Sequence, residues 1–220
     1  EIYGFNYLSE NDYTKAISYL RDATNQGSIT AKINLGTLYR TLAQYQKSFA
    51  ILTQAVDFLD SQTPKNFNLL AHATKALATT QFEMGKYKAA EIEFMKSISI
   101  AEKLYGANNA ELTSYYSDVA AFYGKISVRD LAQKFFKKAL KVVDERNDFT
   151  NYFAISNNYS IFLADNGQNH DAIESLESLA DKLRIKLGNY TQKLSPVLYN
   201  LGNQYQIIGE AKKARQNYKK

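Results

Sequence analysis

The sequence contains no cysteine, no tryptophan and only two prolines among its 220 residues. The lack of cysteine excludes disulfides, thiolate metal sites and cysteine nucleophiles, although it does not fix the compartment in which the protein works. Because Pro64 and Pro196 are the only prolines, long helices are permitted over almost the whole chain. No run approaches the roughly 18 uninterrupted apolar residues that a membrane-spanning helix requires, so we expect no membrane insertion.

A broad excess of charge of one sign is also missing. The formal net charge is +5, but five basic residues stand within the last nine positions, and the other 211 residues carry 22 basic and 22 acidic side chains. These five residues are Lys212, Lys213, Arg215, Lys219 and Lys220. A nucleic-acid-binding surface needs a wider cationic stripe, and we therefore expect no nucleic acid among the partners.

The sequence offers no catalytic or metal-binding motif. His72 and His170 lie 98 residues apart and have no metal-ligand spacing of the HExxH type. There is neither a glycine-rich phosphate loop nor a Gly-x-Ser-x-Gly nucleophile motif. Helical carboxylate pairs such as Glu91 and Glu93 are most simply solvent-facing residues. We therefore expect a protein that is not an enzyme, with no cofactor and no bound metal.

Six units of similar sequence follow one another along the chain, and the stretch at 34–39 (NLGTLY) returns at 200–205 (NLGNQY). The first anchor of each unit is the small residue in its first helix: Gly4, Gly36, Ala78, Ala120, Ser160 and Gly202. The second anchor is the small residue in its second helix: Ala16, Ser48, Ala90, Ala132, Ala172 and Ala214. Four residues beyond the second anchor stand the large side chains Leu20, Leu52, Phe94, Phe136, Leu176 and Tyr218.

Small residues let two helix backbones approach closely, and large residues one turn away fill the adjacent groove. The pattern therefore predicts six helical hairpins, each with an apolar face that only a stacked neighbour can cover. At these spacings the sequence resembles the tetratricopeptide repeat. It departs from that repeat in lacking tryptophan, in having Gln81 where an aromatic is usual, and in its anchor spacings of 32, 42, 42, 40 and 42 residues rather than 34.

Units of about 42 residues resemble those of kinesin light chains and of bacterial peptide-sensing regulators. The stretches at 101–106 (AEKLYG), 180–188 (ADKLRIKLG) and 194–202 (LSPVLYNLG) carry this likeness. The resemblance implies an all-α fold, an α-α superhelix or solenoid of six stacked hairpins.

We expect a single repeat domain over 1–220, and both ends of the sequence look cut, as in a fragment of a longer protein. The units are expected near 1–26, 28–59, 67–104, 109–145, 148–187 and 190–220. Their first helices are expected at about 28–41, 67–83, 109–124, 148–165 and 190–207. A loop is expected at 60–66, because Pro64 ends any helix before it.

In tetratricopeptide arrays the first helices line a concave surface, and the resemblance places the matching stripe at −6, −3, +1, +4 and +5 from each first anchor. Four basic side chains on this stripe, Arg40, His72, Lys75 and Lys125, suit an acidic side chain or a terminal carboxylate of a partner.

Amide side chains are the second feature of this surface. Asparagine stands at −2 in three units (Asn34, Asn158 and Asn200), and Asn157 and Asn203 lie nearby. An amide both donates to and accepts from a peptide backbone, and related peptide-binding arrays use asparagines in this region. The alternative is that these amides bond between helices or simply face solvent. With Tyr199, the predicted partner-binding residues are Asn34, Arg40, His72, Lys75, Lys125, Asn157, Asn158, Tyr199, Asn200 and Asn203.

The sequence thus predicts a scaffold that captures a protein or peptide segment, acidic in character, in a concave groove. Two alternatives remain open at this stage: a peptide-sensing domain that regulates an attached effector, and a self-association module. The partner and the oligomeric state are not predicted.

Overall fold

The computed structural model describes residues 12–143, 148–188 and 191–218, and all regular structure within them is helical. The chain forms two compact units, residues 1–107 and 108–220, which are described separately. The first unit contains α2 (Tyr13–Asn25), α3 (Ile29–Thr41), α4 (Tyr45–Ser61), α5 (Phe67–Glu83) and α6 (Tyr87–Tyr105). The second contains a 3-10 turn η1 (Ala110–Leu112), α7 (Thr113–Lys125), α8 (Arg129–Val142), α9 (Phe149–Asp165), α10 (Asn169–Leu187), α11 (Leu194–Ile207) and α12 (Ala211–Tyr218).

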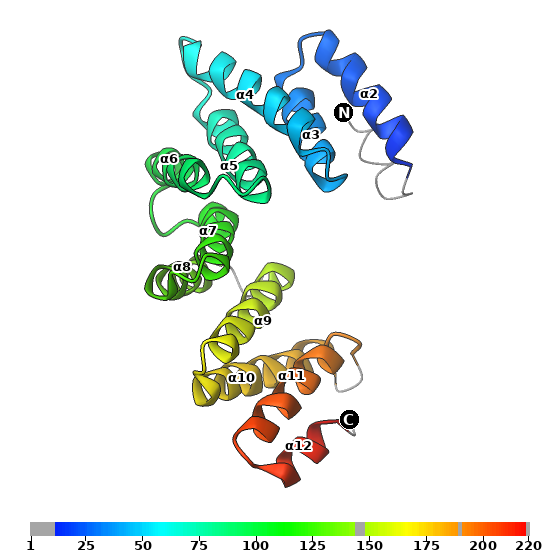
Figure 1. Ribbon diagram of the computed structural model, residues 1–220, viewed down its shortest axis with the longest axis vertical. Helices are drawn as coiled ribbons and strands as arrows, with labels where there is room; N and C mark the ends of the chain where they lie inside the picture. The colour runs from blue at the N-terminus through cyan, green and yellow to red at the C-terminus, as the bar shows by residue number, and fades with distance from the viewer. Residues whose placement is uncertain (1–11, 144–147, 189–190, 219–220) are drawn as a thin grey trace. The chain divides into compact units, whose positions relative to one another are not determined.

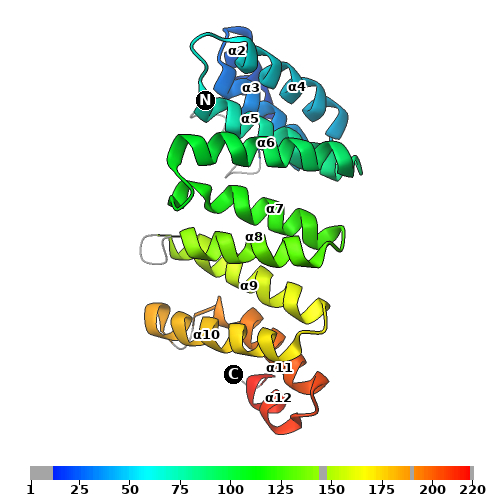
Figure 2. The ribbon, with the colours of Figure 1, turned by 90° about the vertical axis from the view of Figure 1, so that its left-hand side faces the viewer.

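Within each unit, helices that follow one another in the sequence pack side by side as antiparallel hairpins (Figures 1 and 2). First helices of successive hairpins also touch, α3 against α5 in the first unit, and α7 against α9 and α9 against α11 in the second. This is the stacking that the repeat pattern predicts. None of the helices in the described part of the chain is both long enough and apolar enough to cross a bilayer.

The anchor residues lie where the hairpins cross, as the sequence predicts. Every anchor among the described residues is buried, and so are the large residues four positions beyond the second anchor, except Tyr218. A β-carbon on Gly36 would lie 2.6 Å from Cγ of Leu52, which shows how closely α3 and α4 approach. The first helix of the first hairpin, with Gly4, lies outside the described residues.

The turn inside each described hairpin has a residue in the left-handed conformation, always seven positions after the first anchor. Glycine occupies this place at Gly85, Gly167 and Gly209, with φ between 74° and 83°. Ala43 (φ 56°) and Ser127 (φ 62°) occupy it in the other two hairpins. Since a β-carbon is strained in this region, these two turns are less favourable than their glycine counterparts.

Aromatic hydroxyls link consecutive hairpins at equivalent positions. Tyr39 of α3 accepts hydrogen bonds from the Arg21 guanidinium of α2 at 2.9 and 2.6 Å. Tyr205 of α11 instead donates to a carboxylate oxygen of Glu177 on α10 at 2.5 Å. Burial of Tyr205, together with this bond to Glu177, raises the pKa of its hydroxyl to about 12. The same place in the repeat therefore accommodates either direction of hydrogen bonding.

The observed helix boundaries differ from the expected ones at two points. The helix expected from 109 begins as the 3-10 turn η1, with Asn109 capping it, and becomes α-helical at Thr113. The helix expected from 190 begins at Leu194, after a turn at 192–193, while 190 lies outside the described residues. The loop expected at 60–66 is present at 62–66 and contains a cis Thr63–Pro64 peptide bond. The expectation of one domain over 1–220 stays a prediction.

Candidate groove on the first helices of the second unit

The helices α7, α9 and α11 present the predicted stripe in the second unit, and cavities lie along it. Positions at +1 from the first anchor (Ala121, Ile161 and Asn203) recur in the walls of these cavities. Ile161 is 39% exposed although it is apolar, as expected for a side chain in a groove wall. The three cavities are named the apolar pocket, the amide pocket and the end cavity.

The apolar pocket lies between α7 and α9 and has a volume of about 290 Å³. Its lining residues are Ala121, Gly124, Lys125, Phe136, Asn158, Ile161, Phe162, Asp165 and Asn166. The rings of Phe136 and Phe162 are in contact, with their centroids 5.5 Å apart, and both are almost fully buried. Lys125 and Asp165 are exposed and of opposite charge, so the pocket has an aromatic floor and a rim without net charge.

Gly124 is unlike the anchor glycines. A β-carbon there would meet only the ring of Phe162, at 3.4 Å and 3.8 Å, which is ordinary van der Waals contact. Its φ is not positive, so the backbone does not require glycine either. Glycine costs a helix up to about 1 kcal/mol relative to alanine. Neither helix crossing nor backbone conformation accounts for this glycine, and its effect is to leave the pocket open.

The amide pocket lies between α9 and α11 and has a volume of about 160 Å³. Its lining residues are Ser160, Ile161, Ala164, Asp165, Leu176, Asn200, Asn203 and Gln204. Gln204 is only 7% exposed, and its Oε1 has no hydrogen-bond partner among the described residues. A buried polar group without a partner costs about 1–3 kcal/mol, so this amide is an unused hydrogen-bonding site in the pocket wall.

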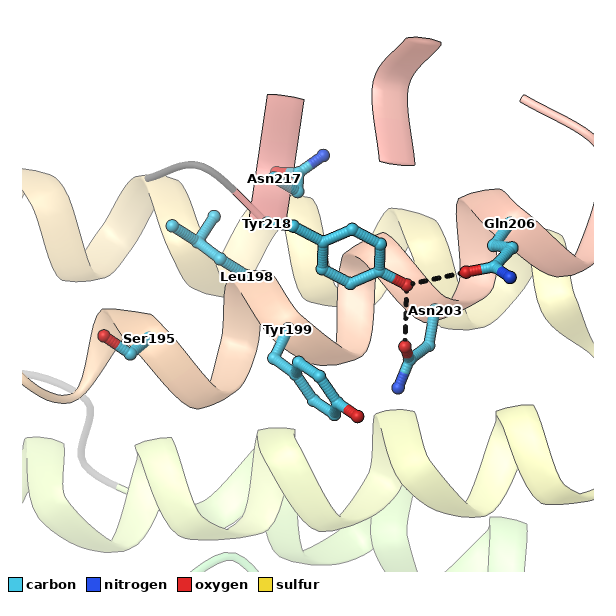
Figure 3. Close-up of a pocket in the computed structure, with 7 residues that line it drawn as sticks. All are labelled: Ser195, Leu198, Tyr199, Asn203, Gln206, Asn217 and Tyr218. Carbon is cyan, nitrogen blue, oxygen red and sulfur yellow. Dashed lines mark hydrogen bonds between the residues drawn. The ribbon is translucent and has the colours of Figure 1, made fainter. Parts of the chain in front are cut away.

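The end cavity, of about 650 Å³, lies between α11 and α12 (Figure 3). Its lining residues are Ser195, Leu198, Tyr199, Asn203, Gln206, Asn217 and Tyr218. The Tyr218 hydroxyl lies 2.8 Å from Oδ1 of Asn203 and 3.1 Å from Oε1 of Gln206. Because the Asn203 oxygen accepts from Tyr218, its nitrogen points away from that hydroxyl (Figure 3). Asn203 borders both the end cavity and the amide pocket. The bond from Tyr218 therefore sets whether the oxygen or the nitrogen of the Asn203 amide faces each cavity.

Five of the six residues predicted in this unit border a cavity. Lys125 and Asn158 line the apolar pocket, Asn200 lines the amide pocket, and Asn203 and Tyr199 line the end cavity. Tyr199 is 61% exposed. The sixth, Asn157, is half-buried and lines none of the three, although its Oδ1 is buried and has no hydrogen-bond partner among the described residues.

The four residues predicted in the first unit line neither the three cavities named above nor the cavity found within the described part of their own unit. Asn34, Arg40 and Lys75 are half-buried, and His72 is exposed. Nε of Arg40 is buried and has no partner within the described part of the chain. A cavity of about 490 Å³ in this unit borders the hairpin turns instead, and its lining residues are Ala43, Gln44, Tyr45, Gln46, Lys47, Met84 and Lys86.

Among the lining residues that lie outside the predicted site, Gly124, Gln204 and Tyr218 contribute most to the shape and chemistry of the groove. Gln204 stands two positions after its first anchor, where the other described hairpins have Leu38, Thr80, Phe122 and Phe162. A glutamine at a position that is otherwise apolar or small is the signal that marks it. As for metals, no group of three or more histidine, aspartate or glutamate side chains is placed to hold an ion in the described ranges.

The sequence profile of the tetratricopeptide repeat matches residues 76–104, which include the C-terminal part of α5 and nearly all of α6. A comparison with curated protein sequences found no significant match.

Solved structures similar to the chain are helical repeat proteins. The crystal structure of BtubC (BKLC) from P. vanneervenii is 14% identical, with a TM-score of 0.78 over 94% of this chain and 85% of that one. A kinesin light chain with tetratricopeptide-like repeats from Podosopora anserina is 15% identical, with a TM-score of 0.76 over 87% of this chain and 92% of that one. A Rap protein complexed with Competence and Sporulation Factor is 12% identical, with a TM-score of 0.69 over 98% of this chain and 71% of that one.

At such low identity these structures establish the fold and nothing more. The all-α class and the long repeats that the sequence predicts are confirmed. The chain therefore carries a tetratricopeptide repeat at residues 76–104, and it has the all-α solenoid fold of the similar helical repeat structures.

Proposed function

We propose that this protein is a binding module that captures a peptide segment of a partner protein in the groove formed by α7, α9 and α11. The observation that carries the proposal is the set of cavities along these helices: the apolar and amide pockets lie between successive first helices, and the end cavity lies beside α11. Concave sites with a few polar groups in otherwise apolar walls are typical of ligand binding. Each cavity of the groove combines polar groups with apolar walls. Helix-lined grooves of this kind receive peptide segments.

Two further observations favour a peptide over a charged ligand. The groove is rich in amides, and a side-chain amide offers the donor and acceptor that a peptide backbone requires. Its exposed charges, Lys125 and Asp165, have opposite signs and are not ion-paired with any described residue. Of the similar structures, the Rap protein is complexed with Competence and Sporulation Factor, and another Rap regulator is in complex with the Phr* peptide. Structures of this fold thus hold such ligands.

The proposal is tested by selecting binders from a displayed library of random peptides, with the purified 220-residue protein as bait. The selected peptides are then titrated against Asn158→Ala/Asn200→Ala, which truncates two groove amides. Neither side chain makes a hydrogen bond with another described residue, so the variant is expected to fold normally. The matched control is Glu174→Gln/Ser178→Ala, which changes two exposed residues on α10.

Selected peptides that bind the parent and the control alike, but bind the groove variant at least tenfold more weakly, support the proposal. Equal binding to all three proteins, or a library that yields no binder, contradicts it. Circular dichroism and light scattering on each variant establish that loss of binding is not loss of folding or a change in oligomeric state.

A further inference from the structure

The apolar pocket and the amide pocket share one wall. Ile161 and Asp165 of α9 border both cavities, so the two open side by side across a single helix. Packed helices lie about 8–10 Å apart, which sets the distance from one pocket to the next at one helix spacing. A ligand that crosses α9 therefore meets two subsites of different chemistry within about 10 Å.

The apolar pocket suits an aromatic side chain. Its floor is made of the Phe136 and Phe162 rings, and its mouth is open because Gly124 has no side chain. A cavity of about 150 Å³ already accommodates benzene, and this one is about 290 Å³. Aromatic rings pack on one another in tilted or offset arrangements, for which two ring walls provide the surface.

The amide pocket suits a carboxamide side chain of the ligand. Gln204 is more than nine-tenths buried and makes no side-chain hydrogen bond within the described residues, while Asn200 and Asn203 stand beside it. Another carboxamide is the group that both donates to and accepts from such a wall. At about 160 Å³ the cavity holds one small polar side chain, since a water molecule takes about 30 Å³.

We propose that the ligand of this groove is an extended segment with an aromatic and a carboxamide side chain three residues apart, one in each pocket. This inference rests on the proposed function and specifies its ligand. In the polyproline II conformation, residues three apart lie on the same side of the chain, and a rise of about 3.1 Å per residue separates them by about 9 Å. A β-strand places residues three apart on opposite sides, so it does not reach both pockets with this spacing.

The test uses fluorescein-labelled peptides in which phenylalanine and glutamine are separated by two prolines, in both chain directions, within a glycine–serine host. Anisotropy titration against the 220-residue protein measures affinity. Peptides with one or three intervening prolines alter the spacing alone. Replacing the phenylalanine or the glutamine by alanine removes one of the two pocket-filling side chains of the peptide at a time.

We expect one of the two directions to bind at least tenfold more tightly with two prolines than with one or three. Each alanine replacement is expected to weaken binding at least fivefold. Two protein variants then show which pocket binds each peptide side chain. Gly124→Leu fills the apolar pocket and should make the phenylalanine and alanine peptides bind equally. Gln204→Leu removes the unpaired amide and should abolish the preference for glutamine.

Both variants are expected to fold. Gly124 has helical backbone angles and an open surface, and leucine already stands at the place equivalent to 204 in another hairpin, as Leu38. The exposed Glu174→Gln of α10 is the matched control, which should leave every affinity unchanged.

Affinities that ignore the spacing, or that respond to neither pocket variant, overturn the inference. So does failure of both peptide directions to bind. If the library selection yields peptides that depend on Asn158 and Asn200 while these designed peptides fail, the two-pocket assignment is wrong and the proposed function stands. If neither experiment yields a groove-dependent ligand, both are wrong.

Discussion

Gly202 and Tyr218 lie in direct contact across the last described hairpin. A β-carbon on Gly202 would lie 2.5 Å from Cε1 and 2.8 Å from Cδ1 of the Tyr218 ring, closer than real side-chain contacts. Because Gly202 of α11 has no side chain, the Tyr218 ring of α12 can lie directly against it. The same ring carries the hydroxyl that bonds Asn203, so an anchor of the fold and a residue of the groove depend on one contact.

Replacing Gly202 by alanine should displace this ring. Overpacking at a tight contact typically costs about 1–3 kcal/mol, and we expect a loss of about 1–2 kcal/mol in the free energy of unfolding, measured by urea denaturation. Gly124→Ala is the control, because its β-carbon meets only the Phe162 ring at 3.4 Å. It should be neutral or stabilising by up to about 1 kcal/mol. Equal effects of the two substitutions would show that the contact does not constrain α11.

The left-handed turn residues give a prediction of opposite sign. Ala43→Gly and Ser127→Gly should each stabilise the protein by about 0.5–1 kcal/mol, because relief of backbone strain outweighs the extra freedom of glycine in the unfolded chain. The measurement is again urea denaturation. Gly85→Ala is the reciprocal control and should destabilise, since it introduces a β-carbon at φ 74°. A loss of stability on Ala43→Gly would mean that the alanine methyl makes contacts that outweigh the strain.

The repeat was predictable because hairpin crossings impose the same demand in every unit. Ala78 and Ala120 had to be small and Leu52 large for the same steric reason, and six matches in register outweigh the poor specificity of each. The left-handed turn position is equally regular. It could not be recognised from the sequence at Ala43 and Ser127, because neither residue type indicates a left-handed conformation. Helix starts were less predictable, since η1 depends on how Asn109 caps the chain.

The groove was predictable only in outline. The repeat register led to Asn158, Asn200 and Asn203, which line cavities in the structure, while their part in binding stays a prediction. A pocket, however, depends on what a side chain leaves open or unpaired. Gly124 resembles an anchor glycine in sequence, and only the distance to Phe162 distinguishes it. Gln204 is polar at a core position, and only its burial without a partner shows it to be unusual.

The hydrogen bond between Tyr205 and Glu177 should make stability depend on pH at the alkaline end. The pKa of Tyr205 is about 12 in the folded protein, against an ordinary value of about 10. The unfolded chain therefore loses this proton first, so the contribution is complete below about pH 10 and is lost as pH rises from 10 to 12. We expect Tyr205→Phe to cost about 1 kcal/mol at pH 8.

This is measured as the difference in unfolding free energy between the parent and Tyr205→Phe from pH 8 to pH 11. The difference should be flat up to about pH 10 and then shrink. In Glu177→Gln the tyrosine loses its anionic partner, and the same difference should be smaller at every pH. A difference that does not change above pH 10 would contradict the assignment.

Glu93 of α6 provides the acidic counterpart. Burial raises the pKa of its carboxyl, and Asp57 and Asp60 of α4 raise it further, while Lys96 opposes them. Its Oε2 is buried without a partner among the described residues. Because the folded state holds the proton more tightly, stability is greatest below the unfolded pKa and falls as pH rises through the folded one. Glu93→Gln should therefore stabilise the protein at pH 7 and have no effect near pH 3.

The gain is expected to stay below about 1 kcal/mol, since Glu93 is only partly buried and water screens its carboxyl. Thermal unfolding at pH 3, 5 and 7 measures it. Glu174→Gln on the exposed face of α10 controls for the removal of one negative charge. If the two substitutions behave alike at all three values of pH, burial of Glu93 is not the cause.

Tyr218→Phe separates the two roles of that side chain. The ring should still rest on Gly202, so the free energy of unfolding should change by less than about 1 kcal/mol. Asn203, however, loses the donor that holds its oxygen, and its amide becomes free to turn about its last torsion. The measurement is the ¹⁵N relaxation of the Asn203 side-chain amide, whose order parameter should fall in the variant.

Tyr199→Phe removes from the same cavity a hydroxyl that makes no hydrogen bond to Asn203, and it should leave that order parameter unchanged. If the Asn203 amide stays equally ordered in Tyr218→Phe, then Gln206 or the helix surface holds it, and Tyr218 does not orient it. If only the Tyr218 variant loosens it, the orientation of a groove amide is set from α12, because a phenol hydroxyl bonded to the Asn203 oxygen leaves the nitrogen to face the amide pocket.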